Sequence, residues 1–139
     1  MNQHPYLRAY MGGIMIPTIV LLVAMTAFTI ARYVCNLPLP IERVIVFPLA
    51  VVPNSWGAWN ILWLASGRRV PIGIFGALLP FLLVPGGVLV LHLVGLSITS
   101  FVPRAVPFFL FPIAVVVYYL VWKYLVAALN RIVDISRDR

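Results

Sequence analysis

Four apolar runs, each long enough to cross a lipid bilayer, constrain this chain more than any other feature of its sequence. A helix that crosses a hydrocarbon core of about 30 Å needs roughly 20 apolar residues, and such runs lie at about residues 11–34, 44–66, 71–95 and 107–130. The first run exceeds the roughly 7–15 apolar residues of a signal peptide. The sequence therefore predicts an all-α integral membrane protein, a four-helix bundle with proline-kinked helices, in which residues 1–139 form a single transmembrane domain.

The composition also indicates that the chain is surrounded by lipid rather than by water. Hydrophobic residues make up 63% of the chain and charged residues 9%, whereas soluble domains contain roughly 45–50% and 25%. Ten Lys and Arg against three Asp and Glu give a net charge of +7. These cations sit beside the apolar runs, where basic residues fix topology and meet anionic head groups. No basic patch interleaved with aromatic residues lies elsewhere, so we expect membrane lipid as a partner and no nucleic acid.

The distribution of the basic residues predicts an orientation. If both termini and the turn at Arg68–Arg69 share one side, that side holds seven of the ten cations, and the other side holds only Arg32, Arg43 and Arg104. Loops rich in Lys and Arg stay in the cytoplasm. We therefore expect a multi-pass protein of a plasma membrane or bacterial inner membrane with its N- and C-termini in the cytoplasm.

A short motif occurs twice. Phe47–Val52, with the sequence FPLAVV, returns 64 residues later as FPIAVV at Phe111–Val116, and Gly13–Pro17 matches Gly76–Pro80 at an offset of 63. The pattern predicts a tandem repeat of a two-helix hairpin, with a pseudo-twofold axis along the membrane normal. Chance similarity between apolar helices that carry an early proline is the alternative.

Two prolines near the middle of their runs predict helix breaks. An interior proline frees the carbonyl four residues before it, and lipid offers that carbonyl no partner. Unusual residues follow in Pro53-Asn54-Ser55 and in Pro85-Gly86-Gly87. We expect the two breaks to face each other, with the glycines allowing close approach and Asn54 donating to a freed carbonyl. The pair forms either a binding or permeation site, or a kinked contact held by an amide and small residues.

The second run also carries deep aromatic and polar side chains. Ser55, Trp56, Trp59 and Asn60 share one sector of a helix with Trp63, which fits an aromatic belt at the membrane surface. The deeper tryptophans either pack against helices or stack on a flat apolar ligand such as a lipid or a quinone-like ring. The candidate ligand or pore residues are Asn54, Ser55, Trp56, Trp59, Asn60, Gly86 and Gly87.

Two further polar residues are expected at the interfaces. Lys123, the only lysine, lies within an apolar run, from which its long side chain can reach the inner head groups. A Schiff-base or lipid-phosphate role for this lysine is the alternative. His92 lies near the outer end of the third run. The expected aromatic collar around Lys123 consists of Tyr118, Tyr119, Trp122 and Tyr124.

The distribution of acidic residues separates classes of function. All three acids, Glu42, Asp134 and Asp138, lie at or beyond the ends of the apolar runs, whereas ion-coupled transport usually needs ionisable groups inside the membrane. Catalysis needs paired groups within hydrogen-bond reach, and we find no such pair, so we expect no enzyme and no cofactor. His4, His92 and the single Cys35 do not have the spacing of metal ligands, so no metal is expected.

These observations favour a non-enzymatic membrane subunit or a protein that binds an apolar ligand or lipid. Four short spans enclose little interior, so we expect a homo-oligomer or a larger membrane complex. The alternative is a small passive channel or facilitator formed by a homo-oligomer.

Overall fold

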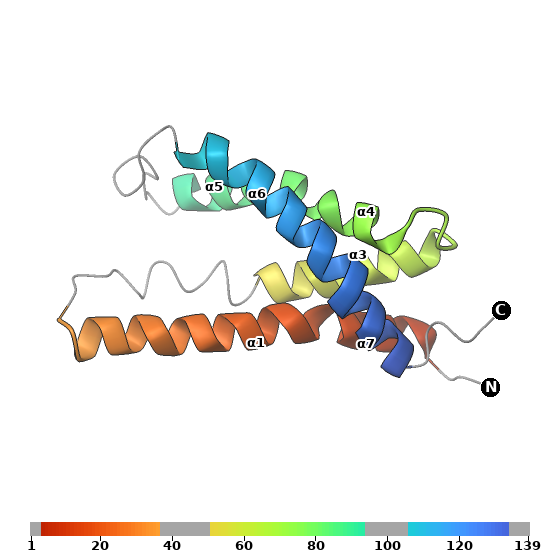
Figure 1. Ribbon diagram of the computed structural model, residues 1–139, viewed down its shortest axis with the longest axis horizontal. Helices are drawn as coiled ribbons and strands as arrows, with labels where there is room; N and C mark the ends of the chain where they lie inside the picture. Colours follow the sequence, from red (N-terminus) through yellow and green to blue (C-terminus); the bar gives the residue numbers. More distant parts are fainter. Residues whose placement is uncertain (1–3, 37–50, 94–105, 134–139) are drawn as a thin grey trace.

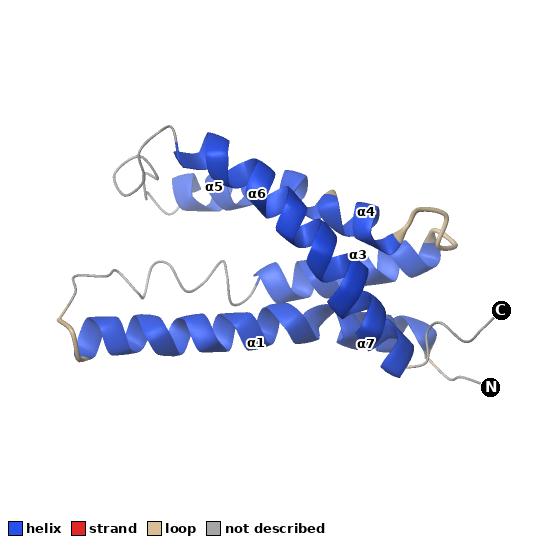
Figure 2. Cartoon of the chain, in the orientation of Figure 1, coloured by secondary structure: helices blue, strands red, loops and turns tan. Residues whose placement is uncertain are grey.

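The structure is a computed structural model that describes residues 4–36, 51–93 and 106–133. Most of these residues are helical, and they include no strand (Figure 1). Figure 2 shows the helices joined by short turns within the described ranges. The all-α prediction is therefore confirmed for this part of the chain. The elements are α1 (Pro5–Tyr33), α3 (Val52–Ala65), α4 (Ile72–Ala77), α5 (Leu79–Leu93), α6 (Val106–Val121), the π-helix η3 (Trp122–Val126) and α7 (Ala127–Ile132).

Three helical runs are long and apolar enough to cross a membrane, namely Pro5–Tyr33, Ile72–Val90 and Phe109–Ile132. They match the first, third and fourth predicted runs. Helix α1 begins at Pro5 rather than near residue 11 because proline suits the first turn of a helix. Of the second predicted run, residues 44–50 lie outside the described residues, and α3 forms most of the remainder.

The helices run back and forth between two ends of the molecule. Helices α1 and α3 are antiparallel and make the most extensive contact, while α4 packs against α6 and η3 (Figure 1). The start of α1, the α3–α4 turn and α7 lie at the same end. There the Arg8 Nη1 donates to the Val133 carbonyl over 3.4 Å. We call the half of the molecule at this end the terminal half, and the half at the other end the distal half.

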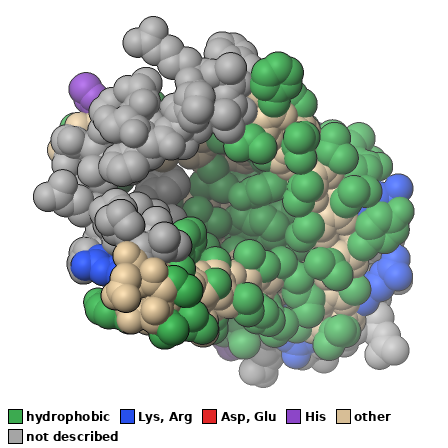
Figure 3. Space-filling model, turned by 60° about the vertical axis from the view of Figure 1, so that its left-hand side comes forward, with side chains coloured by type: hydrophobic (Ala, Val, Ile, Leu, Met, Phe, Trp, Pro, Cys, Tyr) green, Lys and Arg blue, Asp and Glu red, His purple; other side chains and the backbone are tan. Residues whose placement is uncertain are grey.

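The buried hydrophobic cluster lies where α3, α4–α5 and η3 meet. It consists of Trp56, Leu79, Leu83, Trp122 and Val126. Beyond Thr18, by contrast, every residue of α1 is exposed or half-buried. Among the described residues, Figure 3 shows mostly hydrophobic side chains on this face, a hollow near its centre, and Lys and Arg at its edges. Such a surface is typical of a protein surrounded by hydrocarbon rather than water.

The position of the break in α4–α5 corrects a prediction. The helix is interrupted at Leu78, two residues before Pro80, and α5 then continues through Pro85. The break predicted at Pro85 is therefore wrong. The Leu78 N–H donates to the Phe75 carbonyl over 3.3 Å, which is a tighter turn than an α-helix makes. Pro53 lies in the first described turn of α3, and a break there stays a prediction because residues 37–50 lie outside the described residues.

Candidate functional site

A pair of asparagines links three helices inside the terminal half. Asn60 Nδ2 donates to Asn130 Oδ1 over 2.8 Å, and Asn130 Nδ2 donates back to Asn60 Oδ1 over 3.0 Å. Asn60 Nδ2 also donates to the Ala9 carbonyl over 2.7 Å. The two side chains are 0% and 3% exposed. Because buried amides are costly unless paired, this network holds α7 to the α1–α3 pair.

Glycines bring α1 and α3 into backbone contact beside this network. A Cβ added at Gly13 would lie 2.6 Å from the Trp56 carbonyl oxygen, and one at Gly57 would lie 2.5 Å from Tyr10 Cδ2. A Cβ at Gly12 would lie 2.7 Å from Asn130 Oδ1. At Gly13 the added Cβ would meet backbone, so a side chain there would push the helices apart, whereas at Gly12 and Gly57 neighbouring side chains would have to shift. Close packing through small residues therefore contributes to the helix spacing.

An aromatic cluster fills the contact of α3 with η3. The Trp56 ring centroid is 5.0 Å from that of Tyr118 and 5.5 Å from that of Trp122. Trp122 is completely buried against Gly76, where an added Cβ would lie 2.0 Å from Trp122 Cγ. Among the described residues, neither buried indole N–H has a hydrogen-bond partner. Trp56 packs against Tyr118 and Trp122, and a stacking role on a ligand stays a prediction.

The other two tryptophans of α3 donate to backbone carbonyls across the α3–α4 turn. Trp59 Nε1 donates to the Phe75 carbonyl over 2.8 Å, and Trp63 Nε1 donates to the Val70 carbonyl over 2.9 Å. Phe75 lies three residues before the interruption at Leu78, and its carbonyl also accepts from the Leu78 N–H. Trp59 thus adds a second hydrogen bond to a carbonyl beside the interruption and joins α3 to α4 there.

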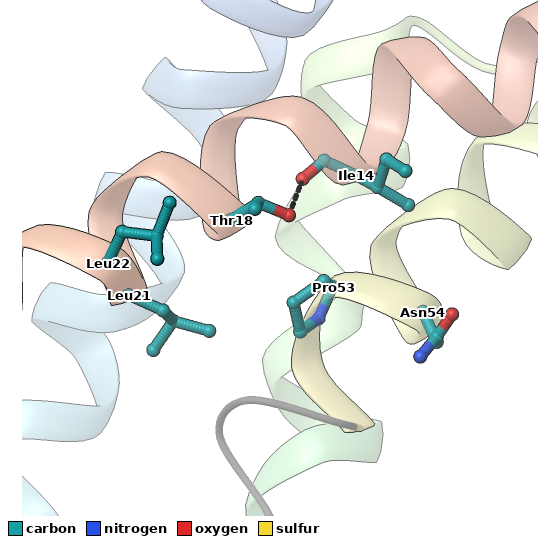
Figure 4. Close-up of a pocket in the computed structure, with 6 residues that line it drawn as sticks. All are labelled: Ile14, Thr18, Leu21, Leu22, Pro53 and Asn54. Atoms are coloured by element: carbon teal, nitrogen blue, oxygen red, sulfur yellow. Dashed lines mark hydrogen bonds between the residues drawn. The ribbon is translucent and has the colours of Figure 1, made fainter. Parts of the chain in front are cut away.

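A cavity of about 240 Å³ lies between α1 and the start of α3, near the middle of α1 (Figure 4). Tyr10 donates a hydrogen bond to Asn54 Oδ1 and so joins the two helices next to it. The Thr18 hydroxyl donates to the Ile14 carbonyl over 2.7 Å, so its polar atom is satisfied within α1. The lining residues are Ile14, Thr18, Leu21, Leu22, Pro53 and Asn54.

A second, shallow and largely open hollow of about 400 Å³ continues along α1 from the first, since Leu22 lines both, and its described lining residues all belong to α1. It is lined by Leu22, Val23, Thr26, Ala27 and Ile30. The Thr26 hydroxyl donates to the Leu22 carbonyl over 2.9 Å. We call the two hollows together the α1 groove. Its lining includes a row with a spacing of four residues, Ile14, Thr18, Leu22, Thr26 and Ile30, which lies along one ridge of the helix.

The predicted ligand or pore residues are spread over several environments. Trp56 and Asn60 are buried, Ser55 and Trp59 are half-buried, and Asn54 lies at the groove. A Cβ added at Gly86 would meet no described atom within 4 Å, so Gly86 does not provide the close helix contact that we expected. Gly87 is half-buried in α5. The structure therefore brings Asn54 to α1, and Trp56 and Asn60 into the core of the terminal half.

Of the two residues predicted at the interfaces, His92 is exposed near the end of α5. Lys123 is exposed on η3, with its Nζ 5.4 Å from the Tyr119 ring centroid and 5.3 Å from that of Tyr124. The predicted aromatic collar is wrong for Trp122, which is buried in the core. No group of three His, Cys, Asp or Glu side chains that could hold a metal occurs in the described ranges.

Sequence reasoning missed Asn130, Tyr10 and the threonines of the groove. The sequence indicated Asn130 only as the end of the fourth apolar run, because a sequence does not show which amide side chains contact each other. The threonine row carried a signal, since Thr18 and Thr26 lie eight residues apart between Ile14, Leu22 and Ile30. Comparison of the chain with known proteins finds no matching family model, no matching curated protein and no matching solved structure.

Proposed function

We propose that this chain is a multi-pass integral membrane protein, without enzymatic activity, that holds a lipid-like apolar ligand along the α1 groove. The groove carries the proposal. It is lined almost entirely by apolar atoms at the middle of a helix long enough to cross a membrane, and its threonine hydroxyls are bonded within α1. A ligand there meets methyl groups and aliphatic side chains. An elongated shape fits a long hydrocarbon chain better than a compact ring system.

The groove is open along one side, which suits a ligand that enters from the surrounding bilayer. Leu22 and Thr26 are exposed although they line it. Apolar side chains gain nothing by association when the solvent is itself hydrocarbon, so an open apolar groove is stable in a membrane. We propose that the protein works as a lipid-binding subunit, in a homo-oligomer or a larger membrane complex.

Filling the groove tests the proposal. Leu22 is 60% exposed and lines both hollows, whereas Val20 is 59% exposed and lines neither. We expect Leu22→Trp to remove a lipid that the wild-type protein retains after mild solubilisation, and the matched variant Val20→Trp to keep it. Native mass spectrometry of the purified full chain measures the retained lipid. Equal retention in the two variants would contradict the proposal.

The proposed topology has both termini in the cytoplasm of a plasma or bacterial inner membrane. The single cysteine tests it, because Cys35 follows α1 directly and is exposed. We expect a membrane-impermeant maleimide to label Cys35 on intact cells. A Cys35→Ser chain that carries Ser66→Cys, in the α3–α4 turn, should be labelled only after the cells are permeabilised. The reverse pattern would invert the proposed topology.

A passive channel formed by a homo-oligomer is the second candidate. The observation in its favour is a polar contact in an apolar surface, namely the exposed Asn54 with Tyr10. A channel should carry flux in reconstituted liposomes, and Asn54→Leu should change this flux. A lipid-binding subunit should be silent in the same assay.

A further inference from the structure

Lys123 presents its charge on the surface of η3 between two aromatic rings. The Lys123 Nζ lies 5.4 Å from the centroid of the Tyr119 ring and 5.3 Å from that of Tyr124, and the side chain is exposed. Cation–π attraction to the two rings favours this position, and the aliphatic stem can lie along apolar surface while the ammonium reaches a polar layer. The charge is therefore held in place and open to a partner.

The contact of Lys123 with Gly73 shows where along the length of the helices Lys123 lies. A Cβ added at Gly73 would lie 3.1 Å from Lys123 Cβ and 3.0 Å from Tyr119 Cε2. Gly73 lies in the first turn of α4, only four residues after Arg69. Lys123 is thus placed beside the α3–α4 turn, at the end of the molecule where both described chain ends lie, rather than at the middle of a span.

The described chain offers Lys123 no acidic partner. The described residues include Arg8, Arg32, Arg68, Arg69, Lys123 and Arg131 but no Asp or Glu, and the three acids of the sequence lie outside them. The Lys123 ammonium, which has no acidic partner among the described residues, favours an anion supplied by the surroundings. At the surface of a membrane the most abundant anions of this kind are lipid head groups.

The surface next to Lys123 is apolar and exposed. Leu120, one helical turn before Lys123, is 44% exposed, and Tyr124, whose ring Lys123 contacts, is 59% exposed. On α4, Ile74 is 48% exposed. A partner that covers this surface needs a negative group for the ammonium and hydrocarbon for the side chains beside it. The Tyr119 and Tyr124 hydroxyls, which are hydrogen-bond donors, can add to the recognition of phosphate oxygens.

We propose that Lys123, flanked by Tyr119 and Tyr124, binds the phosphate of an anionic phospholipid whose acyl chains lie along the exposed apolar surface of α4 and η3. The inference rests on the membrane insertion in the proposed function but not on the α1 groove. A lysine binds phosphate as a compact point charge. Arginine at this position therefore keeps the charge, and glutamine keeps most of the size without it.

The test measures head-group preference. The purified full chain is equilibrated with equal amounts of phosphatidylglycerol and phosphatidylcholine, and native mass spectrometry gives the ratio of bound anionic to bound zwitterionic lipid. We expect Lys123→Gln to lower this ratio about fivefold, which corresponds to about 1 kcal/mol. Lys123→Arg should keep the wild-type ratio within about twofold. An unchanged ratio in Lys123→Gln would overturn the proposal.

Two controls make the result specific. Arg32→Gln removes the same charge at the distal end of α1 and should leave the ratio unchanged; an equal fall in both variants would mean that net charge, not this site, sets the preference. In the absence of lipid, the wild-type and Lys123→Gln chains should bind inorganic phosphate equally weakly. Phosphate binding that depends on Lys123, together with an unchanged lipid ratio in Lys123→Gln, would mean that the ligand is a free phosphate and that the lipid assignment is wrong.

The measurements distinguish the proposed head-group site at Lys123 from the proposed ligand site in the α1 groove. Lys123→Gln should retain the lipid that Leu22→Trp removes, because the groove residues and Lys123 lie on different helices. Thermal unfolding of Lys123→Gln should match the wild-type protein, since the side chain is exposed. A folded Lys123→Gln with an unchanged ratio would refute the head-group site alone.

Discussion

Exposed apolar side chains occur in both halves of the molecule, but within the described residues the close helix contacts lie mainly in the terminal half. The terminal half contains the glycines that meet neighbouring helices, the Asn60–Asn130 pair and the aromatic cluster. In the distal half, α1 continues for four turns with side chains that are exposed or half-buried and lines the α1 groove there. Apolar content therefore does not decide where these helices associate.

We attribute the difference in packing between the two halves to the lipid that we propose surrounds the helices. In lipid there is no hydrophobic force between helices, and association depends on close packing and on hydrogen bonds between helices. The terminal half provides both. In the distal half of α1, Thr26 and Thr29 bond to the carbonyls of Leu22 and Met25 in their own helix, so their hydroxyls are satisfied without a neighbour. Four changes test this account, in order of expected effect.

Trp122→Ala should have the largest effect on stability. It removes the largest buried side chain from the contact of α3, α4 and η3. Replacing a buried Trp with Ala costs about 3–5 kcal/mol in soluble proteins, and we expect the lower part of that range because transfer to lipid contributes little. Unfolding in mixed micelles measures the free energy. Tyr124→Ala, at a 59% exposed neighbour, is the control, and an equal loss there would mean that the core is not where we place it.

Gly76→Ala should destabilise the same contact by about 1–3 kcal/mol, the usual cost of overpacking. The added methyl would overlap Trp122, so α4 must move away from η3. The matched change Gly86→Ala, on α5, meets open space and should be neutral or stabilising by up to about 1 kcal/mol, because Ala favours a helix. Similar free energies of unfolding for the two variants would remove the distinction between packed and open glycines.

Asn60→Leu should cost about 1–2 kcal/mol, because hydrogen bonds between membrane helices contribute about 0.6–1.7 kcal/mol and Asn130 would lose its partner. Asn130→Leu alone should cost a similar amount. The double variant should cost less than the sum of the two single changes, and this coupling is read from a double-mutant cycle. Strict additivity would show that the two amides act separately.

Thr26→Val should change stability by no more than about 0.5 kcal/mol, since it alters an exposed position of the distal half. The same assay in mixed micelles measures it. A loss as large as that of Asn60→Leu would show that the distal half of α1 has a packing partner, and the contrast between the two halves would then fail.

Run length and composition alone predicted the all-α architecture and three of the helical runs, because membrane thickness restricts span length. The same reasoning misplaced the break in α4–α5. The helix is interrupted at Leu78, three residues after the Phe75 carbonyl to which Trp59 donates, and it continues through Pro85. That contact joins two helices and cannot be derived from either segment by itself.

For the candidate site, the sequence indicated one residue of each hydrogen-bonded pair but not its partner. Asn60 was a candidate residue, but its partner Asn130 depends on how α7 crosses α1 and α3. Asn54 was a candidate residue, but Tyr10 lies 44 residues away in sequence. Gly86 attracted attention because glycines often mark close approach. The described glycines in close contact are instead Gly12, Gly13, Gly57, Gly73 and Gly76. Residue type identified the kinds of contact but not their partners.

The π-helix η3 sets the direction in which α7 presents its side chains. A wide turn accommodates about one residue more than an α-helical turn does, and each residue of an α-helix rotates the following side chains by about 100°. Without this extra residue, the Asn130 amide would point about a quarter of a turn away from Asn60. Removing a single residue between Trp122 and Val126 should therefore aim the Asn130 amide away from its partner while leaving the length of the span nearly unchanged.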